Sequence, residues 1–318
     1  MNGRVRHKKY RRRAYRRHNI GIIALISAVA VVAILGMFLI IGNYLHDKSE
    51  ERTNGNISET DTTENLPPQV DKRPSRIIKG QPVMLEANDS LIFSERLDAL
   101  VTESVFDISI PLNTRDGELL YSSPTAKSLG VPVGNQKILL ENASAQAKER
   151  NTFLCGIYHV NAFSENDPLL RSVELSKAAA IIAEALNAGV DEIVIVAPHM
   201  TEEHVSDALR FVESIKSLTV SGAVGLTVPE GIFALEDTVR RSELISTLNG
   251  GVDFLAMDSS TSDNTAALIG DKIAKEKLYL HMYKMRVLLP YTADNELQKA
   301  FIAAAEESGI ENWQISVY

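Results

Sequence analysis

The sequence predicts an α/β fold over residues 77–318, a parallel (β/α)8 barrel of the TIM type, on three observations. Short apolar runs alternate with segments of helical periodicity, which is the pattern of repeated βα units. The turn from helix to strand recurs three times with the same types of residue. No glycine-rich phosphate-binding turn, the usual mark of a doubly wound open α/β sheet, occurs, and that open sheet is the alternative fold.

Seven largely apolar runs are expected to be strands, and in several of them the apolar residues follow one another almost without a break, as in parallel strands that are buried on both faces. The predicted strands are residues 105–110, 152–158, 192–197, 223–228, 253–257, 285–289 and 313–317. Helices are predicted at residues 170–187, 202–217, 238–248, 264–284 and 294–308. A closed barrel needs an eighth strand, for which residues 77–85 or a segment within 131–141 are the weakly patterned candidates.

Local signals mark where these helices begin and end. Gly189, Gly251 and Gly309 each end a helix and are followed by a hydrophobic residue and an acid. Glycine can take the left-handed conformation that stops a helix, so one type of turn is expected at all three positions. Thr201 and Asp294 are expected to cap the helices that follow them. The first helix is expected to bury one apolar stripe, formed by Val173, Ala179, Ile182, Ala183 and Leu186.

The first 76 residues differ in composition from the rest of the chain. Residues 1–19 hold nine Lys/Arg and no acid, so the formal net charge of −8 is +9 in this tail and −17 elsewhere. Residues 20–41 carry no charge, and at about 1.5 Å per residue they form a helix of about 33 Å, enough to cross a bilayer core of about 30 Å. A cleaved signal peptide would have a shorter apolar run and a small-residue cleavage site.

The predicted organisation therefore has four parts. Residues 1–19 form a basic cytoplasmic tail, 20–45 a transmembrane helix, 46–76 a disordered linker and 77–318 the α/β barrel. Positive charge next to a span stays on the cytoplasmic side, so we expect a single-pass protein of the cell membrane with an extracytoplasmic barrel. A terminal basic tail is not a basic face on a folded domain, so no nucleic acid is expected as a partner.

Functional groups of such barrels lie in the loops at the carboxyl ends of the strands. Glu230 and Asp258 follow two consecutive predicted strands and are the candidate catalytic residues. Glycoside hydrolysis uses two carboxyl groups, about 5–5.5 Å apart with retention or about 6.5–9.5 Å apart with inversion, and neighbouring strand ends can supply that spacing. The structural alternatives are an ordinary turn at Glu230 and, at Asp258, an ordinary cap for the next helix.

Other polar residues at predicted strand ends are candidates for binding a substrate: Asn113, Asp116, His159, Asn161, His199 and Tyr291. A metal site would use His159, His199 and His204, but His199 and His204 are not spaced to share one helix face. No metal and no cofactor are therefore expected. The single cysteine, Cys155, lies within a predicted strand and is expected to be a buried small hydrophobic residue, and no G-x-S-x-G motif is present.

The order of several short segments resembles a bacterial family of glycoside-hydrolase-like proteins with a (β/α)8 barrel behind an N-terminal membrane anchor. The similar segments are DGELLY (116–121), GIY (156–158), DPLL (167–170) after Phe163, GVDEI (189–193) and RVLLP (286–290). This family usually has Asp-Val-Lys before the first of them, where this chain has Pro111-Leu112-Asn113. It also usually has an Asp and an Arg after the DEI element, where Val196 and His199 stand here.

The resemblance implies a barrel that binds or weakly hydrolyses a polysaccharide of the cell envelope. The departures at two strand ends imply a diverged member, and a low aromatic content of 6% argues against a long cleft on which sugars stack. The alternative function is a catalytically inactive barrel that serves as an interaction module for another envelope protein.

Overall fold

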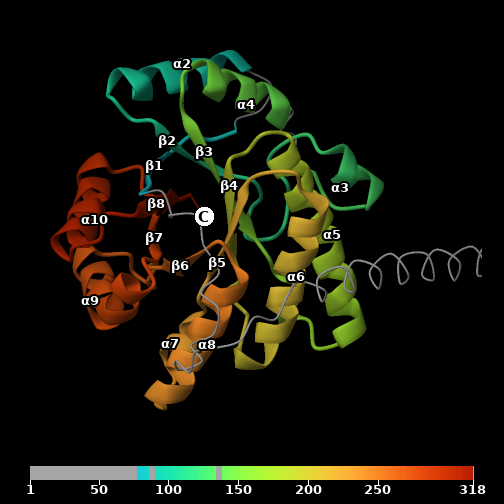
Figure 1. The fold of residues 1–318 in the computed structure, drawn as a ribbon. Coiled ribbons are helices and arrows are strands. Elements are labelled where there is room, and N and C mark those ends of the chain that lie inside the picture. The colour runs from blue at the N-terminus through green and yellow to red at the C-terminus, as the bar shows by residue number, and fades with distance from the viewer. Residues whose placement is uncertain (1–76, 86–89, 134–137, 318) are drawn as a thin grey trace, which may run out of the picture. The chain divides into compact units, whose positions relative to one another are not determined.

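The structure, a computed structural model, describes residues 77–85, 90–133 and 138–317. Eight strands form a closed barrel in chain order, each paired in parallel with the next. Strand β8 pairs with β1, and this pairing closes the sheet. Figure 1 shows the strands as a central ring with the helices outside it. The predicted (β/α)8 barrel is confirmed, and the open sheet is wrong because it would leave two edges unpaired.

The seven predicted strands are all present. They are β2 (Asp107–Pro111), β3 (Phe153–His159), β4 (Glu192–Val196), β5 (Ala223–Thr227), β6 (Phe254–Asp258), β7 (Arg286–Pro290) and β8 (Trp313–Ser316). The eighth is β1 (Lys79–Pro82), from the first of the two candidate segments. In the second segment, Val133 makes only an isolated bridge with Leu119.

The five predicted helical segments are also helical. They correspond to α5 (Pro168–Asn187), α6 (Val205–Leu218) after a short 3-10 helix (Glu202–His204), α8 (Thr238–Gly251), α9 (Ala266–Met282) and α10 (Asn295–Glu307). The sequence patterns missed α2 (Ser90–Thr102), α3 (Pro124–Ser128), α4 (Leu140–Glu149) and α7 (Glu230–Phe233). In α4 the buried face consists mostly of alanine and serine, which gives little hydrophobic periodicity.

The predicted helix ends are partly confirmed. Gly189 and Gly309 take left-handed conformations with φ of 101° and 79°, as expected. Gly251 is the last residue of α8, so it stands at a helix end as predicted, but it does not take the expected left-handed conformation. A Cβ atom at this position would lie 2.4 Å from Cδ2 of Leu209 on α6, so the Leu209 side chain would have to move to accept one. Asp294 caps α10 by accepting hydrogen bonds from the backbone N–H groups of Glu296 and Leu297.

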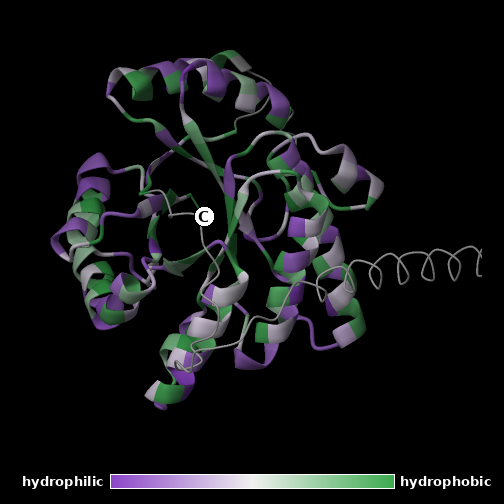
Figure 2. Ribbon diagram, viewed as in Figure 1, coloured by the Kyte–Doolittle hydropathy of each residue, from purple (hydrophilic) through white to green (hydrophobic). Residues whose placement is uncertain are grey.

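Two apolar layers stabilise the barrel. In the first layer, outward-facing residues of the strands pack against the inner faces of the helices. Figure 2 shows hydrophobic residues along the strands. The predicted stripe of α5 contributes Ala179, Ile182, Ala183 and Leu186 to this core. Val173 was wrongly included, because it lies near the start of the helix and is half exposed.

The second apolar layer fills the barrel itself with Ile157, Val194, Val196, Phe254, Ala256 and Leu288. Below it, at the amino-terminal end of the strands, Arg286 forms an ion pair with Glu192 and donates a hydrogen bond to Gln314 at 3.1 Å. The polar groups at the opposite, carboxyl-terminal end are therefore supported by a packed interior.

In the part of the chain that the structure describes, no helix has both the length and the apolar composition needed to cross a membrane. The predicted tail (1–19), transmembrane helix (20–45) and linker (46–76) lie outside the described residues. They remain predictions from the sequence.

Candidate functional site

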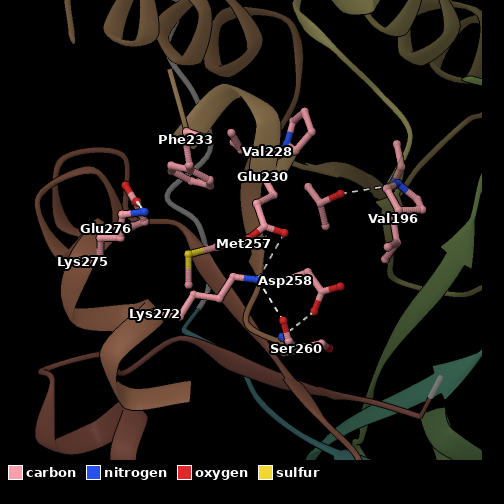
Figure 3. A pocket seen from close by; sticks show the side chains of 15 residues that line it. Val196, Val228, Glu230, Phe233, Met257, Asp258, Ser260, Lys272, Lys275 and Glu276 are labelled. Atoms are coloured by element: carbon pink, nitrogen blue, oxygen red, sulfur yellow. Dashed lines mark hydrogen bonds and ion pairs between the residues drawn. The ribbon is translucent and has the colours of Figure 1, made fainter. Parts of the chain in front are cut away.

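A cavity of about 180 Å³ opens at the carboxyl ends of β4, β5 and β6. Its wall also includes residues of α7 and α9, the helices that follow β5 and β6. Figure 3 shows Glu230, Asp258 and Lys272 facing one another, with the apolar side chains of Phe233 and Met257 beside them. The two candidate catalytic residues therefore line the same cavity, as neighbouring strand ends allow.

Glu230 is the first residue of α7 and lies at the mouth of the cavity. Its side chain is 82% exposed, and its Oε2 atom is 4.0 Å from Nζ of Lys272. Lys272 is held on the other side, because its Nζ atom donates a hydrogen bond to the carbonyl oxygen of Ser260 at 2.9 Å. A general acid of a glycoside hydrolase is normally shielded from water, so the exposure of Glu230 does not favour that role.

Asp258 is the last residue of β6 and is partly buried. Its Oδ1 atom accepts a hydrogen bond from the backbone N–H of Ser260 at 2.9 Å, which fixes the carboxylate in the turn after the strand. The alternative interpretation of Asp258 as an ordinary cap is wrong. The next helix, α9, is capped by Thr265, whose Oγ1 accepts from the N–H of Leu268 at 3.3 Å.

Glu276 is a third carboxyl group in the wall of the cavity, and the sequence patterns did not single it out. It lies on α9 and is only 3% exposed. Burial raises its pKa above the usual value, against the opposing influence of Lys275 and Arg241. The signal that could have found it is its position on the buried stripe of α9, between Ile273 and Leu280.

His159 lies at the end of β3 and is 6% exposed. Its Nε2 atom is buried and has no hydrogen-bond partner among the residues that the structure describes. The pKa of His159 is lowered to about 4, chiefly by burial and to a smaller extent by the positive charge of Arg115. The negative charge of Asp258 acts in the opposite direction. His159 is thus a neutral imidazole within electrostatic range of Asp258, but it does not belong to the wall of the cavity.

Asn113 was predicted to bind substrate, but both functions of its amide are used within the protein. Its Nδ2 atom donates to the carbonyl oxygen of His159 at 2.9 Å, and its Oδ1 accepts from the N–H of His159 at 2.8 Å. The side chain is fully buried and extends the pairing of β2 and β3 by one step. Its geometry is that of a structural residue that holds His159 in place.

The other predicted binding residues lie outside the wall of the cavity. Asp116 is exposed in a turn in which Gly117 has φ of 89° and donates from its N–H to the carbonyl of Thr114. Asn161 donates from Nδ2 to the carbonyl oxygen of Arg115 in the same loop. His199 and Tyr291 are exposed at the ends of β4 and β7.

Among the residues described here, no group of three or more His, Cys, Asp and Glu side chains is arranged to hold a metal ion. The third histidine considered, His204, supports the start of α6, where its Nδ1 accepts from the N–H of Thr201 at 3.2 Å. Cys155 is fully buried, as predicted, and burial raises the pKa of its thiol well above the usual value.

No protein-family model matches this chain, and no curated protein matches it either. Solved structures with a similar arrangement include the spore cortex-lytic enzyme SleL of Bacillus cereus, with 14% identity over 68% of this chain and 52% of that chain and a TM-score of 0.42. Cel5A of Thermotoga maritima is 11% identical over 76% of this chain and 90% of that chain, with a TM-score of 0.48.

The GH113 beta-mannanase AaManA of Alicyclobacillus acidocaldarius is 11% identical over 76% of this chain and 87% of that chain, with a TM-score of 0.49. The match to SleL spans about half of that protein's length. Likenesses of this degree carry no argument about activity. The barrel itself is established by its strand pairing, and its function must be argued from its own residues.

Proposed function

We propose that the chain is a membrane-anchored protein whose extracytoplasmic barrel binds a polysaccharide of the cell envelope and at most weakly hydrolyses it. The observation that carries this proposal is the shared cavity of Glu230, Asp258 and Lys272 at the carboxyl ends of β5 and β6. Carboxylate and ammonium groups bond the hydroxyl groups of a sugar, while Phe233 and Met257 supply apolar surface for its ring.

Binding is better supported than hydrolysis. A hydrolase needs one protonated and one ionised carboxyl group on opposite sides of the glycosidic bond. Glu230 is exposed and lies beside Lys272, whereas Asp258 is held by the turn that follows β6. This arrangement is suited to contacts with hydroxyl groups, and Glu230, at 82% exposure, is not the shielded acid that hydrolysis requires.

The membrane location is proposed from the sequence. The uncharged run of residues 20–41 behind a tail of nine basic residues indicates an anchor with the tail inside the cell. Protease treatment of intact cells is expected to degrade the barrel domain, and protection of that domain would contradict an extracytoplasmic location.

The function is tested with the full-length chain and purified envelope polysaccharide. We expect the wild-type chain to co-sediment with the polysaccharide and the Asp258→Ala variant to lose most of this binding. The release of reducing ends, measured in the same samples, is expected to be slow or absent. Equal binding by wild type and Asp258→Ala would contradict the proposal.

A second candidate, a catalytically inactive module that binds another envelope protein, is favoured by one surface feature. Leu169, Leu170 and Val173 are exposed together near the start of α5, and Leu169 is 78% exposed. Exposed apolar clusters of this kind are common at protein interfaces. A Leu169→Ser, Leu170→Ser variant that loses the function of the chain, while Asp258→Ala keeps it, would favour this second candidate.

A further inference from the structure

Glu276 has a carboxyl group whose bonding capacity is not used. Its Oε2 atom is buried and, within the described residues, has no hydrogen-bond partner. The nearest cations are too distant for hydrogen bonds, because Nη1 of Arg241 is 3.9 Å from Oε2 and Nζ of Lys275 is 4.0 Å from Oε1. Nη1 of Arg241 donates instead to the carbonyl oxygen of Phe233 at 3.0 Å. The Nε atom of Arg241 is also buried and, among the described residues, makes no hydrogen bond to Glu276 or to any other group.

A buried carboxylate oxygen without a donor is costly, so native proteins normally provide one. Glu276 lines the cavity between Lys275 and Phe233, and Figure 3 shows it on the side of the cavity that α9 contributes. The missing donor can therefore come from a molecule that enters the cavity. Sugars carry several hydroxyl groups, and amino sugars carry an ammonium group as well.

We propose that Glu276 is a ligand-binding residue of this cavity and that its Oε2 atom accepts a hydrogen bond from a hydroxyl or ammonium group of a single bound sugar unit. This inference rests on the proposed function and adds a residue and a substrate size to it. The cavity, at about 180 Å³, is smaller than the roughly 300–1,000 Å³ of sites for larger ligands. It is therefore suited to one sugar ring, as at the end of a polysaccharide chain.

The contact makes binding depend on pH in a known direction. A donor on Oε2 stabilises the ionised form of Glu276, so protonation of Glu276 must oppose binding. Burial raises the pKa of Glu276. As the pH is lowered, the affinity should therefore begin to fall at a higher pH than it would if Glu276 had the pKa of an ordinary glutamate. The charged groups around Glu276 are Arg241 on α8, Lys275 and Lys272 on α9, and Glu230 and Asp258 across the cavity.

The test is a titration of the full-length chain with glucose, glucosamine and N-acetylglucosamine, followed by NMR at several pH values between 4 and 8. The Glu276→Gln variant removes the charge but keeps the shape of the side chain. Asp271→Asn is the matched control, because Asp271 is exposed on the same helix and does not line the cavity. Glu276→Asp is a second variant, which keeps the charge but withdraws the carboxyl group by one methylene.

We expect Glu276→Gln to bind at least about tenfold more weakly at neutral pH and to lose the decline in affinity toward low pH. Glu276→Asp should also bind more weakly but keep the pH dependence, and Asp271→Asn should behave as wild type. A preference for glucosamine over glucose would identify the donor as an ammonium group, and equal binding of both would identify it as a hydroxyl group.

If Asp258→Ala abolishes binding while Glu276→Gln binds as wild type at every pH, the proposed function stands and the role of Glu276 is refuted. If none of the three sugars and no envelope polysaccharide binds the wild-type chain, both proposals fail.

Discussion

Replacing Arg286 with methionine would remove the cation from the ion pair inside the amino-terminal end of the barrel. Arg286 is 1% exposed, and its guanidinium group pairs with the buried carboxylate of Glu192. The same group bonds Gln314 at 3.1 Å and Asn312 at 3.2 Å, and it lies 4.3 Å above the centre of the Phe254 ring. These contacts link β4, β6, β7 and β8 across the interior.

The expected loss follows from what the substitution leaves behind. Methionine fills much of the same space, but the carboxylate of Glu192 would remain buried without its cation, and breaking a buried pair in this way costs about 3–5 kcal/mol. A domain of this kind is stabilised by about 5–15 kcal/mol in total, so the variant should unfold at a clearly lower urea concentration. The double variant Arg286→Met, Glu192→Gln should recover part of the loss, because it leaves no unpaired charge.

The assay is urea unfolding of the full-length chain, followed by the fluorescence of Trp313. This residue is the only tryptophan of the sequence and is buried at the start of β8. Arg240→Met is the control, because Arg240 forms only exposed ion pairs and its loss should cost at most about 0.5 kcal/mol. A loss below about 1 kcal/mol for Arg286→Met, or a double variant less stable than either single variant, would refute the reasoning.

Four further substitutions test the structure in the same unfolding assay. Asn113→Ala would leave the buried N–H and carbonyl groups of His159 unpaired and should cost about 2–4 kcal/mol, whereas a loss under about 1 kcal/mol would contradict the structural role of Asn113. The pKa of His159 is lowered to about 4, so the unfolded chain takes up the proton first as the pH falls, and stability should decrease by about 3 kcal/mol between about pH 6.5 and pH 4. His159→Gln should remove this loss of stability between about pH 6.5 and pH 4. An unchanged pH dependence of the stability would contradict the lowered pKa of His159. Gly225→Ala would place a Cβ atom 2.2 Å from the Phe254 ring and should cost about 1–3 kcal/mol. Gly250→Ala, in an open position on α8, should instead add up to about 1 kcal/mol, and similar effects of the two alanines would argue against tight packing in the barrel.

The barrel is predictable from the sequence because its strands are apolar on both faces. Residues Glu192–Val196 show the reason, since every one of them is buried, between the interior of the barrel and the surrounding helices. Strand β1 is the exception, because Lys79 is exposed and only Gly80 of its four residues is fully buried. Its short sequence carries little pattern, and only the pairing with both β2 and β8 identifies it.

The candidate site is predictable only in part. Glu230 and Asp258 follow consecutive strands, so their positions in the chain already place them at one end of the barrel. Glu276 lies in the middle of α9, and the face that it presents to the cavity depends on how this helix packs beside β6. Asn113 was predicted to bind a substrate but has a structural role, because a polar residue at a strand end can equally well complete the pairing of the backbone.

The central claim, that a sugar occupies the cavity at the ends of β4, β5 and β6, is tested most directly by NMR of the full-length chain with labelled methionine methyl groups. Met257 lines the cavity, whereas Met285 is buried outside its wall and serves as an internal control. On addition of glucosamine or N-acetylglucosamine, the signal of Met257 should shift in a saturable manner while that of Met285 stays in place. Binding that leaves the signal of Met257 unchanged would contradict the account.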